Sequence, residues 1–316
     1  MPHKIVFCCL VALAFAFPAH GASLWNPEPG FVPEDARRAI PNNPAPPERV
    51  VPAHALPPLP ATSEGVIRRV ATREKVAALT FDLCELSTIT TGYDAEIIDF
   101  LREKRIPATL FMGGKWMRTH AERTMQLMAD PLFEIGNHAW AHGNFGIMDE
   151  RSMLEQVRWT QAEYELLREK VLERAKAEGR EAEPPEAMRL FRLPYGRCSD
   201  KALALLAREG LEVVQWSVAA ETPQDNSLPG LGKRVAGQVR PGAIILFHAN
   251  RVPKGSAAML RETVGELQLW GYRFVTVGEL LRLGEPQRAR DGYFNKPGDN
   301  LILDKKFGID GTGRRK

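Results

Sequence analysis

Hydrophobic and polar positions follow two different patterns between Val66 and residue 283. Apolar runs of five to eight residues, rich in β-branched and aromatic side chains, are typical of buried strands. Longer segments between them repeat apolar positions every three or four residues, which predicts amphipathic helices. The predicted strands span residues 76–82, 108–114, 132–136, 188–194, 211–218, 242–249 and 272–277. The predicted helices span residues 94–105, 119–129, 149–178, 200–209, 228–239, 256–270 and 277–283.

The regular alternation of strand and helix predicts an α/β fold. Strands separated by helices pair in parallel, and the helices cover the outside of the sheet. About seven such units in about 215 residues favour a barrel of about seven parallel strands over an open sheet. We therefore predict one catalytic domain over residues 66–283.

The segment before this domain has a different composition. Residues 27–60 contain 11 of the 24 prolines of the chain. Proline lacks an N–H group and clashes with a preceding helical turn, so this segment is unsuited to helix or central strand. We expect residues 22–65 to form an extended leader of the polyproline type, either a spacer or a segment that lies along the domain surface.

The first 21 residues are typical of a secretory signal peptide. A single lysine, Lys4, precedes an apolar run that is too short for a membrane span, and Ala19 to Gly21 offer a small-residue cleavage site. An uncleaved anchor is the alternative. We predict an exported protein, periplasmic or secreted, without stable membrane insertion after cleavage.

The C-terminal end and the net charge of the chain say less about its fold and function. Residues 284–316 have no apolar periodicity and form a predicted C-terminal tail, whose aromatic and aliphatic residues can pack back on the domain. The formal net charge is only +3, so no nucleic-acid partner is expected. The sequence does not determine the oligomeric state.

Reactive side chains follow the predicted strands at the point where each strand ends. In α/β barrels the functional residues lie at this edge of the sheet. Five predicted strands end in this way. The residues concerned are Asp82, His138, His142, Arg192, Tyr195, Trp216 and His248.

These residues predict a metal-assisted hydrolysis. His138 and His142 can bind a divalent metal, and zinc suits imidazole ligands. Asp82 could accept a proton from water, His248 could protonate a leaving amine, and Arg192 could hold the carboxylate in place. Structural alternatives exist for each: a surface or core histidine pair, a capping or ion-paired aspartate, and a core histidine. Trp216 could equally be a core residue.

The ordered motifs TFD, HAWAH, RLPYG, QWS and LFH resemble the polysaccharide deacetylases with a NodB-type domain, the family-four carbohydrate esterases. The resemblance implies a distorted (β/α) barrel, a divalent metal and removal of N-acetyl or O-acetyl groups from a glycan. By position it makes Asp82 the base, His138 and His142 metal ligands, and Arg192 the partner of the base. The remaining positions match an oxyanion donor, two walls of the acetyl pocket and the general acid, which are the Tyr195 backbone N–H, Trp216, Leu246 and His248.

Two positions depart from the family pattern. Leu83 stands where the family has a metal-binding aspartate, and Ala219 stands where it has the aspartate that tunes the acid histidine. Glu221 is a candidate replacement for the second of these. The stretches TFDLCE and FHAN resemble a branch of deacetylase-like sequences with TFDAC and HAN in these motifs.

Three functions are therefore compatible with the sequence. The first is a metal-dependent deacetylase acting on a polysaccharide such as peptidoglycan or a chitin-like glycan. The second is a degenerate domain that binds glycan without turnover, because the metal-binding aspartate is absent. The third is an amide hydrolase that acts on a small non-sugar substrate.

Two cysteines remain after the predicted cleavage site, Cys84 and Cys198. Because each lies close to a site motif, we predict that they form a disulfide in the exported protein. Two separate buried thiols are one alternative. The other is that Cys84, or Glu85 beside it, supplies the third metal ligand in place of Leu83.

Overall fold

The computed structural model describes residue 24 and residues 41–60, 65–222 and 225–313. The predicted signal peptide, residues 1–21, lies outside the described residues, and so does part of the predicted leader. No helix among the described residues has the length and hydrophobicity that a membrane span requires.

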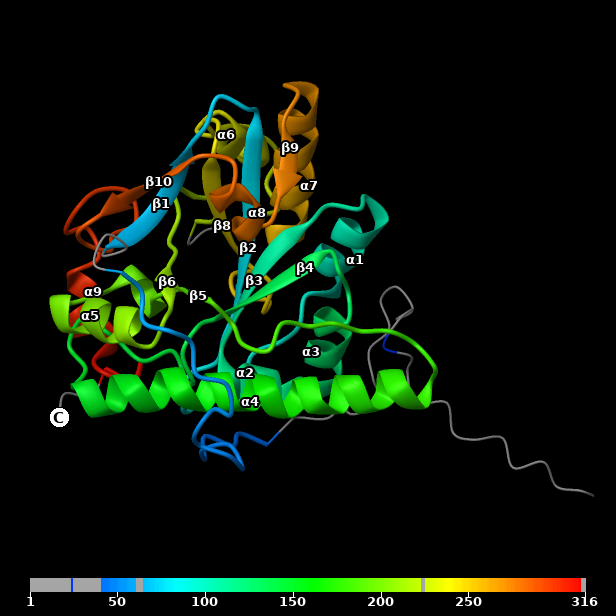
Figure 1. The fold of residues 1–316 in the computed structure, drawn as a ribbon. Helices are drawn as coiled ribbons and strands as arrows, with labels where there is room; N and C mark the ends of the chain where they lie inside the picture. The colour runs from blue at the N-terminus through cyan, green and yellow to red at the C-terminus, as the bar shows by residue number, and fades with distance from the viewer. Residues whose placement is uncertain (1–23, 25–40, 61–64, 223–224, 314–316) are drawn as a thin grey trace, which may run out of the picture.

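A curled, mostly parallel sheet forms the centre of the molecule, with helices packed around it (Figure 1). Its strands are β1 (Val66–Ala71), β2 (Val76–Leu83), β3 (Ala108–Met112), β4 (Phe133–Asn137), β5 (Leu190–Phe191), β6 (Glu212–Val213), β7 (Val218–Ala219), β8 (Ala243–His248), β9 (Arg273–Val275) and β10 (Glu285–Ala289). The helices are α1 (Ala95–Glu103), α2 (Gly114–Thr119), α3 (Ala121–Met128), α4 (Glu150–Ala177), α5 (Asp200–Arg208), α6 (Leu231–Ala236), α7 (Ser256–Leu269), α8 (Val277–Leu281) and α9 (Ile302–Phe307).

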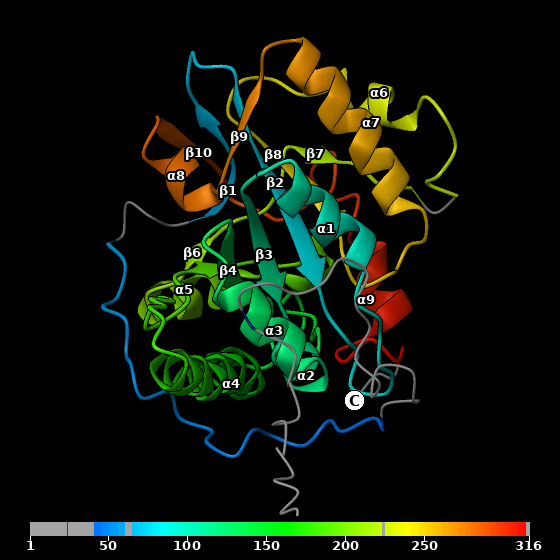
Figure 2. The same cartoon turned by 90° about the vertical axis from the view of Figure 1, so that its right-hand side faces the viewer.

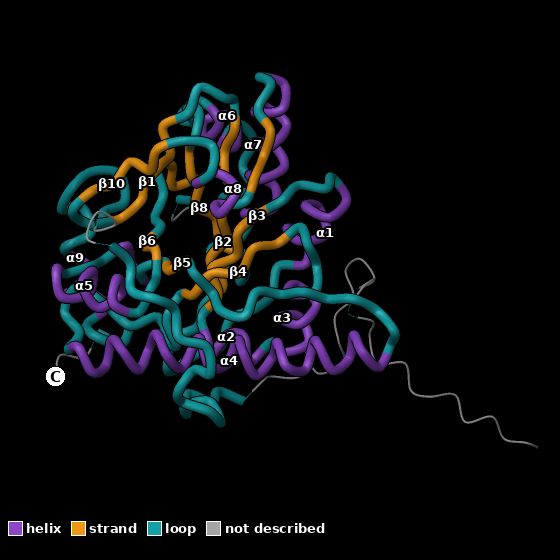
Figure 3. The backbone as a smooth tube through the Cα atoms, in the orientation of Figure 1, coloured by secondary structure: helices purple, strands orange, loops and turns teal. Residues whose placement is uncertain are grey.

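The predicted barrel architecture is confirmed. The strands follow the order β10-β1-β8-β2-β3-β4-β5-β6, with β7 beside β8 and β9 beside β2. All described pairings are parallel except those of β1, which runs antiparallel to β8 and β10. An isolated bridge between Ile67 and Val214 joins the two ends of the curved sheet. Short strands and this single bridge make the barrel distorted (Figures 2 and 3).

Three predictions of local structure were wrong in detail. The helix predicted over 119–129 corresponds to α3, and the sequence pattern missed the short helix α2 before it, which His120 separates from α3 by its non-helical backbone (φ −117°, ψ 46°). The strand predicted over 211–218 is divided into β6 and β7. The sequence pattern also missed β1 and β10, whose antiparallel pairing brings residues 285–289 of the predicted tail into the sheet.

Strand β2 explains how one strand supplies both core and site. All eight of its residues are buried, and its side chains alternate between the two sides of the sheet. Phe81 and Leu83 belong to the large core beneath the outer helices. Ala78 belongs to the core inside the barrel, and Asp82 lies on that inner side because it is an even number of residues away. The alternation therefore sends Leu83 away from the side occupied by Asp82.

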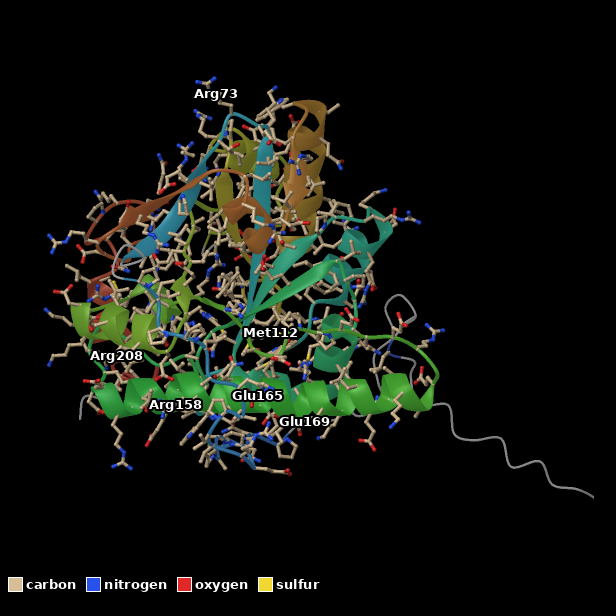
Figure 4. All side chains as sticks on the ribbon, in the orientation of Figure 1. Arg73, Met112, Arg158, Glu165, Glu169 and Arg208 are labelled. Atoms are coloured by element: carbon tan, nitrogen blue, oxygen red, sulfur yellow. The ribbon has the colours of Figure 1, made fainter. Side chains whose placement is uncertain are left out.

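The described part of the leader, residues 41–60, lies along the long helix α4 without helix or strand of its own (Figure 1). The carboxylate of Glu165, buried on α4, accepts hydrogen bonds from the backbone N–H groups of Ala53 (2.6 Å) and His54 (3.0 Å). Arg49 forms ion pairs with both Glu165 and Glu169, two acidic residues labelled along this helix in Figure 4. This segment lies along the domain surface, which is one of the two arrangements predicted for it.

Candidate active site

The predicted site residues gather at the carboxyl ends of the parallel strands. Asp82 pairs directly with His248 in the register between β2 and β8. His138 follows β4, and Arg192 follows β5. The backbone N–H of His138 donates to the carbonyl of Met112, labelled at the end of β3 in Figure 4. Parallel pairing therefore brings residues from four separate motifs to one edge of the sheet.

A buried ion pair orients the proposed base. Arg192 Nη1 lies 2.9 Å from Asp82 Oδ1 and donates a second hydrogen bond to Thr80 Oγ1 at 2.8 Å. The other guanidinium nitrogens donate to the backbone carbonyls of Val214 (3.3 Å) and Gln215 (3.0 Å). The arginine is completely buried and held at several points. It therefore holds the Asp82 carboxylate in one orientation, with Oδ2 directed toward the histidines.

The hydrogen bonds of His138 leave its outer ring nitrogen available. Nδ1 lies 2.8 Å from the carbonyl oxygen of Arg192, an oxygen that can only accept, so Nδ1 carries the proton. Nε2 is buried without a hydrogen-bond partner and lies 3.4 Å from Asp82 Oδ2. A backbone acceptor on one ring nitrogen and a free lone pair on the other is typical of a metal-binding histidine.

His142 and Cys84 complete a cluster around this free nitrogen. The ring centroids of His138 and His142 are 5.0 Å apart, and Nδ1 of His142 has no hydrogen-bond partner. One ring nitrogen of each histidine and the sulfur of Cys84 lie within 4.8 Å of one another. Two histidines that each have an unpartnered buried ring nitrogen, with a thiol beside them, fit a divalent metal, as the sequence predicts for the two histidines.

Burial and neighbouring charges set the protonation of this cluster. Burial lowers the pKa of His138, although Asp82 acts in the opposite direction. Burial also lowers the pKa of His142 well below its ordinary value, and His138 and His248 act in the same direction. Burial raises the pKa of the Cys84 thiol well above its ordinary value, and Asp82 and Glu85 add to this effect. In the metal-free protein both imidazoles are therefore neutral, which is the state that binds metal.

The opposite side of the site carries a histidine with a carboxylate partner. His248 Nδ1 lies 2.5 Å from Glu221 Oε2, and the backbone N–H of His248 donates to Glu221 Oε1 at 3.1 Å. The hydroxyl of Ser256 donates to the same carboxylate. Burial opposes the charged imidazolium, but Glu221 outweighs it, so the pKa of His248 is raised. Glu221 therefore contacts the histidine that the family pattern pairs with an aspartate at position 219, as the sequence suggested for this residue.

The site loops contain strained backbone. Ala139, His142 and Tyr195 have positive φ angles (63°, 56° and 57°), which are uncommon for residues other than glycine. Such strain persists only where surrounding contacts enforce it, and it clusters at functional sites. The rings of His142 and Tyr195 meet edge to face at 4.4 Å between centroids, so the two strained loops contact each other directly.

The C-terminal segment packs against the same loops. The sequence indicated that this tail can pack back on the domain, but not that it contacts the site loops. Phe307 in α9 stacks on Tyr195 at 4.9 Å, and Arg197 pairs with Asp304 at 2.8 Å. Asn300 donates to the carbonyls of Tyr195 (3.3 Å) and Gly196 (2.8 Å). Aromatic residues and Asp304 were the available signals, but their partners lie about a hundred residues earlier in the chain.

The two predicted pocket walls lie inside the barrel. Trp216 and Leu246 belong to one buried core cluster and are 2% and 4% exposed. The Trp216 ring contacts Phe294 of the C-terminal segment (5.3 Å), and its Nε1 has no hydrogen-bond partner. Their role toward an acetyl group remains a prediction.

The predicted disulfide is wrong, because Cys84 and Cys198 are both free. The sulfur of Cys84 lies beside the two histidines. The sulfur of Cys198 lies in another core cluster and accepts the backbone N–H of Gly292 at 3.1 Å. Proximity of two motifs in a barrel mouth does not bring every pair of side chains together.

Comparisons with known proteins agree with this arrangement. Residues 69–214 match the sequence model of the polysaccharide deacetylase family. The chain is 33% identical over 159 residues to a chitooligosaccharide deacetylase from Sinorhizobium fredii, an alignment that covers 49% of this chain and 65% of the relative. It is 29% identical over 217 residues to a peptidoglycan-N-acetylglucosamine deacetylase from Bacillus cereus, covering 67% of this chain and 91% of the relative.

Among solved structures, a wild-type CE4 family pseudoenzyme from Bacillus anthracis superposes with a TM-score of 0.55 and 22% identity. The superposition covers 69% of each chain. This likeness concerns the fold alone, and it supports the distorted barrel of the NodB type.

Proposed function

We propose that the chain belongs to the polysaccharide deacetylase family, whose model residues 69–214 match, and that it is a metal-dependent hydrolase that removes N-acetyl or O-acetyl groups from a glycan such as peptidoglycan or a chitin-like polymer. One observation carries the proposal. A paired carboxylate, two histidines with unpartnered nitrogens and a carboxylate-bound histidine occupy one edge of the sheet. These are the groups that hydrolysis of an amide or ester needs.

The base is Asp82. Its Oδ1 is occupied by Arg192, while Oδ2 faces His138 and remains able to accept a proton from water. Because Arg192 is fixed by four hydrogen bonds, the carboxylate is positioned before substrate binds. The matching position in the family gives the backbone N–H of Tyr195 the role of oxyanion donor.

The acid is His248. Glu221 binds Nδ1 and raises the pKa of His248, so Nε2 carries a proton that it can give to the leaving amine or alkoxide. His138 and His142 would hold a divalent metal, which would supply Lewis-acid chemistry to the reaction. Zinc is the metal that we propose. The protein is proposed to act outside the cytoplasm on an envelope or environmental glycan, after export through its signal peptide.

The experiment is acetate release from chitooligosaccharides and from peptidoglycan by the purified full chain. Asp82→Asn should lower kcat by about 10²-fold to 10⁴-fold, because an amide cannot accept the proton. Asp130→Asn is the matched control, since Asp130 also pairs with an arginine, Arg102, at 2.7 Å but lies outside the site. Acetate release by Asp82→Asn at the wild-type rate would overturn the mechanism.

The glycan-binding alternative is favoured by one observation, the burial of Leu83 in the outer core. It predicts that the wild-type protein binds these glycans but releases no acetate from them with any divalent metal added. That outcome would replace the hydrolase proposal.

A further inference from the structure

The end of β2 presents three consecutive side chains at the place where the family pattern has a metal-binding aspartate. They are Leu83, Cys84 and Glu85. Leu83 is excluded because its side chain has no donor atom, and it is fully buried in the core under the outer helices together with Phe81. A metal ligand must come from one of the other two, or from another part of the chain.

Glu85 is excluded by its partners. Its carboxylate is 1% exposed and accepts hydrogen bonds from Lys115 Nζ (2.7 Å), Thr119 Oγ1 (2.8 Å) and the backbone N–H of Thr91 (3.0 Å). Breaking a buried ion pair to bind a metal elsewhere would leave Lys115 without its counter-ion, which is costly. Glu85 therefore fixes the loop after β2 and does not reach the histidines.

Cys84 is the residue that the loop presents to the site. Its sulfur lies within 4.8 Å of one ring nitrogen of His138 and one of His142, and it is not part of a disulfide. Both histidines have an unpartnered buried ring nitrogen, and His138 is only 1% exposed. The three donor atoms are close enough to share one ion.

A buried amide from the fifth motif supports this cysteine. Asn250 is 3% exposed, and its Nδ2 donates to the carbonyl of Cys84 at 3.0 Å and lies 3.7 Å from its sulfur. Its Oδ1 accepts the backbone N–H of Val252, which fixes the direction of the amide. An N–H donor beside a ligand sulfur is typical of the outer shell of a metal–thiolate site.

Building on the proposed function, we propose that Cys84 is the third protein ligand of the metal, and that Asn250 is the positioning residue that directs its sulfur. The chain then has a His₂Cys site in place of the two histidines and aspartate of the family pattern. Binding replaces the S–H bond by a sulfur–metal bond, and the proton leaves to solvent. Three protein ligands with one open position are typical of catalytic zinc sites.

The ligand set has a consequence for metal choice. A thiolate is softer than a carboxylate, so the site should favour zinc and cobalt over magnesium and manganese. The lost aspartate at position 83 is then no sign of a metal-free domain, because the next residue along the chain supplies a donor of different chemistry.

The test is titration of the metal-free full chain with Co²⁺, followed by ultraviolet–visible absorption. The wild-type protein should develop a thiolate-to-cobalt charge-transfer band at one equivalent. Cys84→Ser should remove the band and weaken Co²⁺ and Zn²⁺ binding by more than the 10-fold to 100-fold that loss of an outer-shell partner costs. Cys198→Ser is the matched control, because Cys198 is the other free cysteine and binds Gly292 instead.

Two further variants distinguish the loss of a metal ligand from the loss of the folded structure. Cys84→Asp should restore metal binding without the band, since a carboxylate can coordinate but gives no sulfur charge transfer. Asn250→Asp keeps the shape but loses the N–H donor, and it should weaken metal binding by about 10-fold to 100-fold while the band remains. Wild-type affinity in Cys84→Ser, or a charge-transfer band that persists in Cys84→Asp, would overturn the ligand assignment.

The outcomes separate this inference from the proposed function. If cobalt binds through the histidines without a charge-transfer band, and acetate is still released, Cys84 is not a ligand and the hydrolase proposal stands. If the band appears but no acetate is released from any glycan, the thiolate site stands and the hydrolase proposal fails.

Discussion

The two sides of the site differ in how completely their polar atoms are paired. On the metal side, His138 Nε2 and His142 Nδ1 have no hydrogen-bond partner, and Cys84 is free. On the acid side, His248 Nδ1 is bound by Glu221, which also accepts hydrogen bonds from a backbone N–H and from Ser256. Buried polar groups are normally paired, so the metal side is incomplete in the protein alone and the acid side is already organised.

The two departures from the family pattern fit this contrast. On the acid side, a longer carboxylate two residues further on reaches the histidine that Ala219 cannot bind. On the metal side, the next residue after Leu83 supplies a thiol. In each case a residue one or two positions further along the chain lies beside a histidine of the site.

The largest effect should come from removing the metal side. His138→Ala combined with His142→Ala should abolish stoichiometric Zn²⁺ binding and reduce acetate release to background, because both imidazole ligands are lost. Elemental analysis of the purified protein measures the metal content. A double variant that retains one zinc per chain would show that the site has been assigned to the wrong residues.

Removing the metal from the wild-type protein should lower its free energy of unfolding, a smaller effect than the loss of activity in the double variant. A metal that binds only the folded state stabilises it by about 2.7 kcal/mol at a free concentration 100 times its Kd, so chelation should lower the melting temperature. Differential scanning calorimetry with and without Zn²⁺ measures this. The same shift in His138→Ala, His142→Ala would contradict the expectation, since that variant has no site to fill.

Removing the carboxylate partner of His248 should change the pH dependence of kcat and leave the metal bound. Glu221 raises the pKa of His248, so Glu221→Gln should lower that pKa and let the histidine lose its proton at a lower pH. The descending alkaline limb of kcat should move to lower pH, and kcat near neutral pH should fall about 10-fold to 100-fold. Glu262→Gln is a suitable control, because that carboxylate binds backbone N–H groups of Gly230 and Gly232 away from the site. An unchanged alkaline limb would exclude Glu221 as the partner that tunes the acid.

The smallest effect should come from the C-terminal segment. Phe307→Ala removes the ring stacked on Tyr195, an aromatic contact of about 0.5–1.5 kcal/mol, and should lower the free energy of unfolding by about that amount. Because Tyr195 also contacts His142, KM should rise while metal content stays constant. Urea denaturation and steady-state kinetics measure the two effects. A variant as stable as the wild type would show that this stacking contributes nothing.

Much of the fold followed from local pattern. Strands β2, β3 and β8 are buried and almost continuous in hydrophobicity, so their positions were predicted within a few residues. Strands β5, β6 and β7 have two residues each, and neighbours in the sheet decide their extent. Strand β10 exists because β1 offers it an antiparallel partner about 220 residues earlier in the chain, a pairing that no local pattern encodes.

The sequence by itself determined the barrel and the order of reactive residues at its strand ends, because period-two and period-3.6 patterns fix which side chains face inward. Only the tertiary structure decided which neighbouring side chain lies beside the site histidines at each of the two positions where the family pattern has an aspartate. Leu83, Cys84 and Glu85 are consecutive, and their directions depend on the core under β2, on Lys115 and on Asn250. Contacts between segments far apart in the chain set those directions, so the same three letters could have presented a different donor in another fold.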